Sequence, residues 1–380
     1  MTEKLYDKDS YLKEFTASVL ECEKSDETWV VVLDKTAFFP EAGGQKSDRG
    51  SLDEAQVLDV QIENEIIKHF TDKPLEVGKV VKGEIDFERR FDFMQQHSAE
   101  HIVSGVAHSL YGCENVGFHL SEEIVTLDFD KPLSEDEVLK IEEIANQKVF
   151  KNVSFKCYYP DLKELETLNY RSKKELEGDI RIVEIEDTDM CACCAPHVKT
   201  SGEIGLVKLL STEKLRGGIR IELKAGKRAL ADYNEKYRNI KKISSLLATA
   251  QNETAVGVER LLNTLGEQKA EMTALKYEVL KAKAQSFCPK GDVTANFEEN
   301  LTVRDLQIFA DFLHKIYGGI RGAFSQTENG YAFCICGDGL DDLFYEFKAT
   351  FNVKGGGRNG MVQGTVMAEK NEIENFFLKN

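Results

Sequence analysis

Two histidines stand four residues apart in the stretch QQHSAEHIVSG, residues 95–105. On a helix, His97 and His101 would lie on one face, one turn apart, so both imidazoles could reach one metal ion. Glu100 precedes the second histidine, and H-x-x-E-H is also the signature of a class of zinc peptidases. A histidine pair alone is weak support for a metal site, so this interpretation needs further ligands.

The stretch DTDMCACCAPHVKTSGEIG, residues 187–205, supplies a second pair. Cys193 and His197 form a C-x-x-x-H motif, with Cys191 and Cys194 beside them. Thiolate and imidazole are the commonest zinc ligands in proteins. Together with the two helical histidines, this motif predicts one tetrahedral zinc site with three nitrogen ligands and one sulfur ligand. The spacing leaves open which of the three cysteines binds.

A third segment, TAFFPEAGGQKSDRG at residues 36–50, has a pair of glycines followed by a glutamine. Gly43 and Gly44 allow a close approach of the backbone to a ligand or a positive φ, and Gln45 offers both a donor and an acceptor. A hairpin turn explains the same glycines, and from the spacing alone it is the favoured interpretation.

The overall composition describes an ordinary folded protein. The 380 residues are 42% hydrophobic and 30% charged, enough for two or three domains. The formal net charge of −17 argues against nonspecific coating of nucleic acid or acidic membranes, but it is compatible with a local basic surface. The N-terminus has no signal-peptide pattern, no stretch reaches the roughly 20 apolar residues of a membrane helix, and the nine cysteines therefore indicate reduced thiols. We expect a cytoplasmic protein without a membrane partner.

The pattern of elements predicts an α+β fold in four parts. Residues 1–86 have short β-branched runs and are expected to form a β-rich, barrel-like subdomain. Residues 87–226 are expected to form the α+β core that contains the zinc site. Its first helix is predicted at 91–112, and a second helix begins with a capping box between Ser134 and Glu137.

The remaining two parts follow from a change in composition. Residues 227–285 are poor in glycine and proline and predict a long helical hairpin or coiled coil, broken near Gly257. Residues 290–380 predict a compact α/β unit, in which the glycine-rich segment 353–365 is expected to be a loop. The leucines of the helical part fall at near-helical spacing and are interpreted as packing residues: Leu246, Leu247, Leu261, Leu262, Leu265, Leu275 and Leu280.

The three segments quoted above occur in the order and spacing of the editing domain of alanyl-tRNA synthetases, and they resemble the freestanding AlaX editing proteins equally well. The resemblance continues through RGGIRIELKAGKRAL, residues 216–230. It then reaches VKGGGRNGMVQGT, residues 353–365, which resembles part of the DHHA1 domain that ends these synthetases. It covers practically the whole chain, which is similar to the long form of AlaX. A class II aminoacylation domain would need hundreds of residues before Thr36, so we expect no charging of tRNA by that route.

The resemblance implies hydrolysis of the ester that joins a wrong amino acid to the terminal ribose of alanine tRNA. An alanine-sized pocket cannot exclude glycine and discriminates weakly against serine, so a second, hydrolytic site is needed. The expected activity is therefore deacylation in trans of seryl-tRNA, and also of glycyl-tRNA, of the alanine type.

The resemblance also implies roles at the site. It favours Cys193 as the thiolate ligand, although this sequence reads CCAPH where the family commonly reads CGGTH. Gln45 and Thr36 are expected to line the amino-acid pocket. Amides near Gly43 and Gly44 are expected to stabilise the negative charge that develops on the ester carbonyl.

Two groups of residues are the expected tRNA contacts. In the C-terminal group, glycine backbone can lie against a sugar-phosphate surface while flanking cations contact phosphates. Its members are Lys354, Gly355, Gly356, Gly357 and Arg358. A second, basic group follows the cysteine motif and consists of Lys208, Lys214, Arg216, Arg220, Lys224, Lys227 and Arg228. A homodimer through the helical or the C-terminal region is a further expectation.

Two other function classes stay open. A zinc peptidase of the H-x-x-E-H type would need Glu100 as its general base and would not need Cys193. A noncatalytic tRNA-binding protein with structural zinc would bind tRNA without turnover. The editing interpretation treats Glu100 only as a helix residue beside a ligand, because only the histidines belong to the family pattern.

Overall fold

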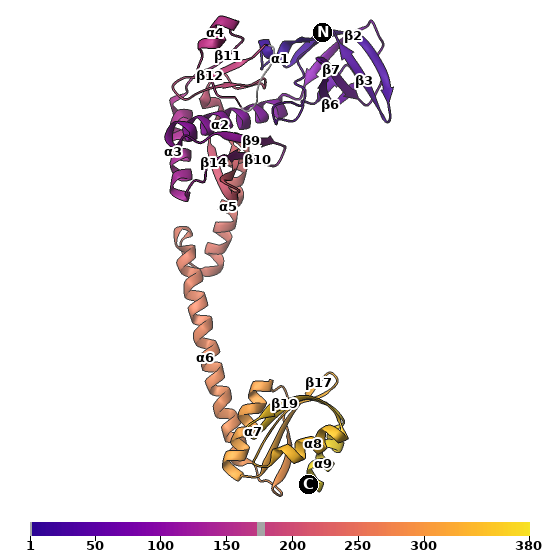
Figure 1. Ribbon diagram of the computed structural model, residues 1–380, viewed down its shortest axis with the longest axis vertical. Helices are drawn as coiled ribbons and strands as arrows, with labels where there is room; N and C mark the ends of the chain where they lie inside the picture. The colour runs from indigo at the N-terminus through magenta and orange to yellow at the C-terminus, as the bar shows by residue number, and fades with distance from the viewer. Residues whose placement is uncertain (1, 173–178) are drawn as a thin grey trace. The chain divides into compact units, whose positions relative to one another are not determined.

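The computed structural model describes residues 2–172 and 179–380 and has a mixed α+β architecture, which confirms the expected class (Figure 1). The chain divides into two compact units, residues 1–241 and 242–380. The finer division of the chain into four parts stays a prediction. Within the described ranges, no helix combines the length and the apolar character that crossing a membrane requires.

Six antiparallel strands of the first unit form a barrel. They pair in the cyclic order β2-β3-β7-β6-β5-β8, and β8 returns to pair with β2. Buried and exposed residues alternate along β8, as expected for strands with one face on a core. The interior is filled by buried aromatic and β-branched side chains, among them Phe38, Phe39 and Val31. The strands are β2 (Glu14–Ser25), β3 (Thr28–Leu33), β5 (Gly50–Leu52), β6 (Ala55–Glu63), β7 (Ile66–Thr71) and β8 (Val80–Ile85).

Helix α2 (Phe87–Tyr111) follows the barrel directly and carries the histidine pair. The Asp86 side chain accepts a hydrogen bond from the Arg89 amide at its start, and Gly112 ends it with a φ of 61°. The middle of the helix is buried even where its residues are polar. This burial arises because α3, η1 and strands of two different sheets all pack against α2.

Two sheets and further helices complete the first unit. A four-stranded sheet has the order β14-β15-β10-β9, and a three-stranded sheet has the order β11-β12-β13. The predicted capping box of Ser134 and Glu137 is confirmed at the start of α3. The elements are β9 (Asn115–Leu120), β10 (Val125–Phe129), α3 (Glu135–Lys151), β11 (Phe155–Tyr158), α4 (Leu162–Thr167), β12 (Ile182–Ile185), β13 (Asp189–Ala192), η1 (Ser201–Ile204), β14 (Val207–Leu215) and β15 (Gly218–Ala225). Short elements near the N-terminus are β1 (Glu3–Lys4), α1 (Leu5–Lys8) and β4 (Lys35–Thr36).

The helical region differs from its prediction in the position of its break. The helical structure is interrupted between α5 (Gly226–Leu247) and α6 (Thr254–Ser286), where the short 3-10 helix η2 (Gln251–Glu253) lies, and not at Gly257. Gly257 instead lies in the first turn of α6, where a Cβ atom would approach Leu247 and Thr249 to 3.1 Å. Within this chain only Leu280 of the listed leucines is buried, so the interpretation as packing residues is confirmed for Leu280 and stays a prediction for the others.

The second unit contains a five-stranded sheet of order β16-β17-β18-β20-β19. The glycine-rich segment predicted as a loop is instead a hairpin of this sheet. Asn359 and Gly360 form its turn with φ values of 59° and 74°, the backbone that a two-residue hairpin turn requires. The hairpin consists of β19 (Asn352–Arg358) and β20 (Met361–Met367), and the other elements are β16 (Val293–Phe297), α7 (Val303–Tyr317), β17 (Ile320–Thr327), β18 (Gly330–Cys336), α8 (Leu340–Thr350) and α9 (Lys370–Lys379).

Candidate metal centre and active-site cavity

The structure brings the four predicted metal ligands together. Ligand atoms of His97, His101, Cys193 and His197 all lie within 4.8 Å of one another. The Cys193 Sγ atom is 3.6 Å from His97 Nε2 and 3.4 Å from His197 Nε2. Tetrahedral zinc with bonds of roughly 2.0 Å to nitrogen and 2.3 Å to sulfur would separate these atoms by about 3.6 Å. The donor set and its spacing therefore fit a zinc ion, and Cys193 is the cysteine close to all three imidazoles, whereas Cys191 lies near His101 and Asp189.

Each histidine of the cluster is held by its other ring nitrogen. The three contacts are His97 Nδ1 to Gln45 Oε1 at 2.9 Å, His101 Nδ1 to Asp189 Oδ2 at 3.3 Å, and His197 Nδ1 to Ser98 Oγ at 3.1 Å. A partner at Nδ1 fixes the ring and leaves Nε2 as the ligand atom. Within the described ranges, the buried His101 Nε2 atom has no hydrogen-bond partner, which is expected of an atom that binds a metal.

Electrostatics favour the ligand forms of Cys193 and His197. Burial raises the pKa of the Cys193 thiol, but the neighbouring histidines outweigh this effect and bring its pKa well below the ordinary value. The thiolate is the form that binds metals. Burial lowers the pKa of His197 to about 3, so its imidazole is neutral at physiological pH and can donate a lone pair.

Two carboxylates surround His101. Its Nδ1 atom contacts Asp189, and its Nε2 atom lies 3.9 Å from Glu100 Oε2. Burial lowers the pKa of His101, but the charge of Glu100 and the hydrogen bond to Asp189 raise that pKa well above its usual range. These carboxylates stabilise a cation at Nε2, whether a proton or a metal ion.

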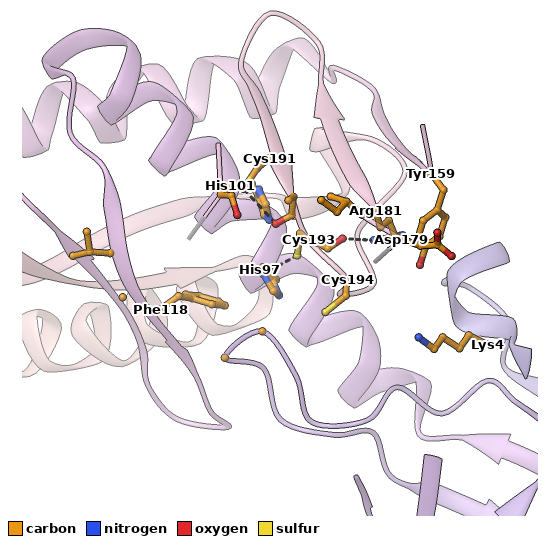
Figure 2. A pocket seen from close by; sticks show the side chains of 17 residues that line it. Lys4, His97, His101, Phe118, Tyr159, Asp179, Arg181, Cys191, Cys193 and Cys194 are labelled. Atoms are coloured by element: carbon orange, nitrogen blue, oxygen red, sulfur yellow. Dashed lines mark hydrogen bonds between the residues drawn. The ribbon is translucent and has the colours of Figure 1, made fainter. Parts of the chain in front are cut away.

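The cluster opens on a cavity of about 630 Å³. Figure 2 shows Phe118 on one side of the cluster and Lys4, Tyr159 and Asp179 on the other. The Phe118 ring lies against His97, with ring centroids 4.6 Å apart. One end of the cavity is therefore aromatic and the other is polar and charged, so the two ends suit chemically different parts of a substrate.

The glycine pair is both a turn and a part of the cavity wall. Ala42 and Gln45 exchange two backbone hydrogen bonds, and Gly43 and Gly44 between them have φ values of 60° and 82°. A Cβ atom on Gly44 would lie 2.5 Å from the Phe118 carbonyl oxygen, so only glycine fits there. Both glycines line the cavity. The hairpin interpretation of the spacing is confirmed, and the turn also lies beside the metal ligands.

Gln45 and Thr36 do not line the cavity. Gln45 is fully buried behind the cluster, where it orients His97. The Thr36 hydroxyl lies in the barrel, 2.8 Å from His69 Nε2, and it accepts a hydrogen bond from the Phe38 amide. Both residues thus contact the framework of the site and not its free space.

Several residues of the site were not identified by the sequence patterns. Arg171 forms two hydrogen bonds of 2.8 Å with Asp189, and Arg181 donates to the Cys193 and Ala195 carbonyls at 3.0 and 2.9 Å. Asp189 lies only four residues before Cys193, so an acidic residue close to the cysteines was the one available hint. The arginines lie farther from the motif in sequence, and only folding brings them to it.

The two groups of predicted tRNA contacts differ in ion pairing and in exposure. Five residues of the basic group are engaged in ion pairs with acidic residues of the same unit: Lys208, Arg220, Lys224, Lys227 and Arg228. The C-terminal group lies on the edge strand β19, and all residues from Lys354 to Arg358 are exposed. The edge strand is thus the more accessible of the two candidate surfaces.

Comparison with known proteins assigns the chain to a family. Residues 180–222 match the model of the threonyl and alanyl tRNA synthetase second additional domain, and residues 7–89 match the model of class II (A) tRNA synthetases. The alanyl-tRNA editing protein Aarsd1 of Mus musculus is 31% identical over 277 residues, which are 68% of this chain and 67% of that protein. The chain belongs to the alanyl-tRNA editing proteins.

Two further relatives of this editing-protein chain show how far the similarity extends. The alanyl-tRNA editing protein AlaX-L of Pyrococcus horikoshii is 28% identical over 393 residues, 98% of this chain and 96% of that protein. The alanine–tRNA ligase of Ignicoccus hospitalis is 33% identical over 291 residues, 73% of this chain. The chain spans only 31% of that ligase's length.

Proposed function

We propose that this chain is a trans-acting deacylase that hydrolyses seryl-tRNA, and also glycyl-tRNA, of the alanine type. The observation that supports it most strongly is the ligand cluster at a cavity whose wall includes the Gly43–Gly44 turn. The names of two relatives, Aarsd1 and AlaX-L, support the same activity, since both are alanyl-tRNA editing proteins.

In this proposal His97, His101, Cys193 and His197 hold a zinc ion. A zinc ion held by all four would be closed and structural, whereas one held by three, with water or substrate in the fourth position, would supply a Lewis acid for the ester carbonyl or for the attacking water. Gln45, Ser98 and Asp189 orient the ligand imidazoles, as the contacts of their side chains indicate.

The cavity wall would bind the ester. Gly43 and Gly44 present a backbone without side chains, so their amides can approach the carbonyl oxygen as it becomes negatively charged. Gln45 and Thr36 act in this proposal as positioning residues, because neither lines the free space. Gln45 holds His97, and the Thr36 hydroxyl fixes the chain between β4 and the turn through the Phe38 amide.

A deacylation assay tests the activity directly. Purified protein is incubated with seryl-, glycyl- and alanyl-tRNA of the alanine type, and loss of the amino acid is followed. We expect rapid loss of serine and slower loss of glycine and alanine, because a site that binds the serine hydroxyl discriminates against substrates without it. Equal rates with all three substrates, or no hydrolysis of any, would contradict the proposal.

Substitution of two proposed ligands tests whether the site binds zinc. The double variant His97→Ala, Cys193→Ala is expected to lose bound zinc and activity together, while Cys288→Ser, which changes an exposed cysteine outside the site, keeps both. Zinc retained at full occupancy in the double variant would refute this ligand set. Zinc-dependent binding of tRNA without turnover would favour the noncatalytic alternative, and cleavage of peptides would favour the peptidase.

We also propose that the second unit binds the body of the tRNA through the edge strand β19. Lys354 and Arg358 flank three exposed glycines on this strand, so phosphates can approach the backbone closely.

Helix α6 is proposed to pair with a second copy of the chain. Val258, Leu265, Met272 and Val279 recur every seven residues and are exposed. Leu261 and Leu275 take the intervening positions of the same heptad repeat, so the exposed stripe has the pattern of a coiled-coil seam.

A further inference from the structure

Helix α5 exposes two aromatic rings side by side. Tyr233 and Tyr237 lie one turn apart and are 61% and 46% exposed. Their ring centroids are 6.3 Å apart, and the ring planes differ by only 10°. Leu230, one turn before them, is exposed as well. Apolar side chains that are exposed singly need no explanation, but a contiguous group of them is typical of a binding surface.

Two cations adjoin the tyrosines. Lys241 lies one turn after Tyr237, and Arg238 lies three residues before Lys241, so these side chains share a continuous surface. Both cations are exposed, and among the residues that the structure describes neither has an ion-pair partner. The neighbouring Lys236, in contrast, binds Asp232 at 2.5 Å. We call the four residues of this surface the tyrosine face: Tyr233, Tyr237, Arg238 and Lys241.

The carboxylates of this part of α5 lie away from the tyrosine face. A helix turns about 100° per residue, so Glu235, two residues before Tyr237, lies on the opposite side. Asp232 is engaged by Lys224 and Lys236. The tyrosine face is therefore basic on a chain whose net charge is −17, and it is complementary to a polyanion.

The start of α5 is fixed to the helix that carries the ligand histidines. The Gln96 side chain accepts a hydrogen bond from the Ala225 amide at 2.7 Å and donates one to the Ala225 carbonyl at 2.9 Å. Arg228, in the first turn of α5, binds Asp92 of α2 at 2.6 Å. A helix rises 1.5 Å per residue, so Tyr233 lies roughly 12 Å beyond Ala225. One extended polymer can therefore contact both the cavity and the tyrosine face.

We propose that the tyrosine face binds unpaired nucleotides of RNA. The two rings stack on bases, and Arg238 and Lys241 contact the adjacent phosphates. The nucleotides must be unpaired, because the bases of a duplex are already stacked on one another. A second copy of the chain is a poorer occupant, since a symmetric contact through this face would bring like charges together. The identity of this RNA as the tRNA substrate rests on the proposed function, whereas the binding itself can be tested without it.

The first test measures binding of the full chain to a short labelled single-stranded RNA of mixed sequence by fluorescence anisotropy. Tyr233→Leu together with Tyr237→Leu keeps apolar side chains but removes the rings, so binding should weaken about tenfold or more. Tyr233→Phe together with Tyr237→Phe keeps the rings and should bind within about twofold of the unchanged protein. Tyr345→Leu, at a tyrosine that is 74% exposed on α8, is the matched control and should not change binding.

The second test measures the salt dependence of the same binding. Arg238→Gln together with Lys241→Gln should make the slope of log affinity against log salt smaller by about 1.4, because each phosphate contact with a single strand contributes about 0.7. Lys24→Gln, at an exposed lysine of the barrel strand β2, should leave the slope unchanged. An unchanged slope in the Arg238–Lys241 variant would overturn the assignment of these cations.

Two results would overturn the stacking role. RNA affinity of the leucine variant within about twofold of the unchanged protein would show that the rings do not bind bases. Self-association of the unchanged protein that the leucine variant abolishes, with no change in RNA affinity, would make the face a protein interface.

Turnover distinguishes a failure of this inference from a failure of the proposed function. With seryl-tRNA, the leucine variant should raise KM and leave kcat within about threefold, because the face lies outside the cavity. An active deacylase whose leucine variant keeps both KM and RNA affinity would refute the tyrosine face alone. If the unchanged protein lacks deacylase activity, the comparison of RNA affinities still decides the inference.

Discussion

At the scale of single residues, the buried histidines divide between the ligand cluster and the barrel. His97, His101 and His197 converge on one centre, whereas His69 is enclosed by the barrel. The His69 Nδ1–H group donates to the Val31 carbonyl at 3.1 Å, so its Nε2 atom accepts from the Thr36 hydroxyl. A neutral His69 satisfies both contacts, and a protonated one would lose the second.

His69 makes the barrel sensitive to acid. Burial lowers the pKa of His69 from 6.5 to about 4, so the unfolded chain binds a proton below pH 6.5 that the folded protein does not. The contribution of His69 to the free energy of unfolding is therefore complete above pH 6.5 and is lost as the pH falls toward 4. Between pH 7.5 and 5 the free energy of unfolding should fall by about 2 kcal/mol because of this one residue.

The measurement is urea unfolding followed by Trp29, the one tryptophan of the chain, which lies on β3 of the barrel. In His69→Gln an amide replaces both hydrogen bonds and does not titrate. The difference in unfolding free energy between the variant and the unchanged protein should shift by that amount across the pH range. An unchanged difference would show that His69 does not titrate on unfolding.

At the scale of elements, a glycine allows β19 and β20 to approach each other closely in their hairpin. A Cβ atom on Gly357 would lie 1.9 Å from the Met361 carbonyl oxygen, whereas one on Gly356 meets nothing within 4 Å. Gly357→Ala should therefore destabilise the hairpin by about 1–3 kcal/mol, while Gly356→Ala stays within about 0.5 kcal/mol. Hydrogen exchange of the β19 and β20 amides measures the difference. Equal exchange in the two variants would mean that a methyl group at position 357 does not disturb the pairing of β19 with β20.

The α6 stripe gives a second prediction at this scale. Leu265→Lys places a charge in the middle of the exposed heptad seam, and Asn263→Lys places the same charge at an exposed position outside the seam. We expect sedimentation equilibrium to show a dimer for the unchanged protein and for Asn263→Lys, and a monomer for Leu265→Lys. A dimer that survives Leu265→Lys would place the interface elsewhere, and an unchanged protein that is monomeric would refute the seam.

At the scale of the whole molecule, the proposed function requires an acidic chain to bind a polyanion. The net charge is −17, and most of the basic group after the cysteine motif is neutralised by ion pairs. The proposed binding of tRNA would then depend on a few exposed cations and on backbone contacts, and its salt dependence would reflect only those few phosphate contacts.

Arg358→Glu tests this dependence. We expect weaker binding of intact tRNA and a salt slope smaller by about 1, because one phosphate contact is lost. Hydrolysis of a short aminoacylated acceptor-stem mimic should hardly change, since the mimic lacks the body of the tRNA. Lys379→Glu makes the same charge change at an exposed position outside β19 and serves as the control. Equal losses on both substrates would assign Arg358 to folding or assembly.

The sequence by itself determined the residues that carry chemistry. Histidines four apart on a helix and a cysteine–histidine motif predict a metal site, because ligand type and helical spacing are local properties. The same local logic predicted the capping box of Ser134 and the α+β class. The Gly43–Gly44 turn was also accessible to the sequence, since a two-residue turn needs positive φ at both positions.

Only the tertiary structure decided which residues surround those ligands. Cys193 is distinguished from its neighbours by its distance to the imidazoles, and Gln45 and Thr36 are placed behind the cavity by the packing of the barrel. The glycine-rich C-terminal segment pairs with β18, a contact between segments, although its Asn359–Gly360 turn is a local hairpin signal. The Glu100 carboxylate also accepts a hydrogen bond from Asn115, which β9 brings to α2. Such contacts depend on the packing of distant segments, which local sequence patterns do not encode.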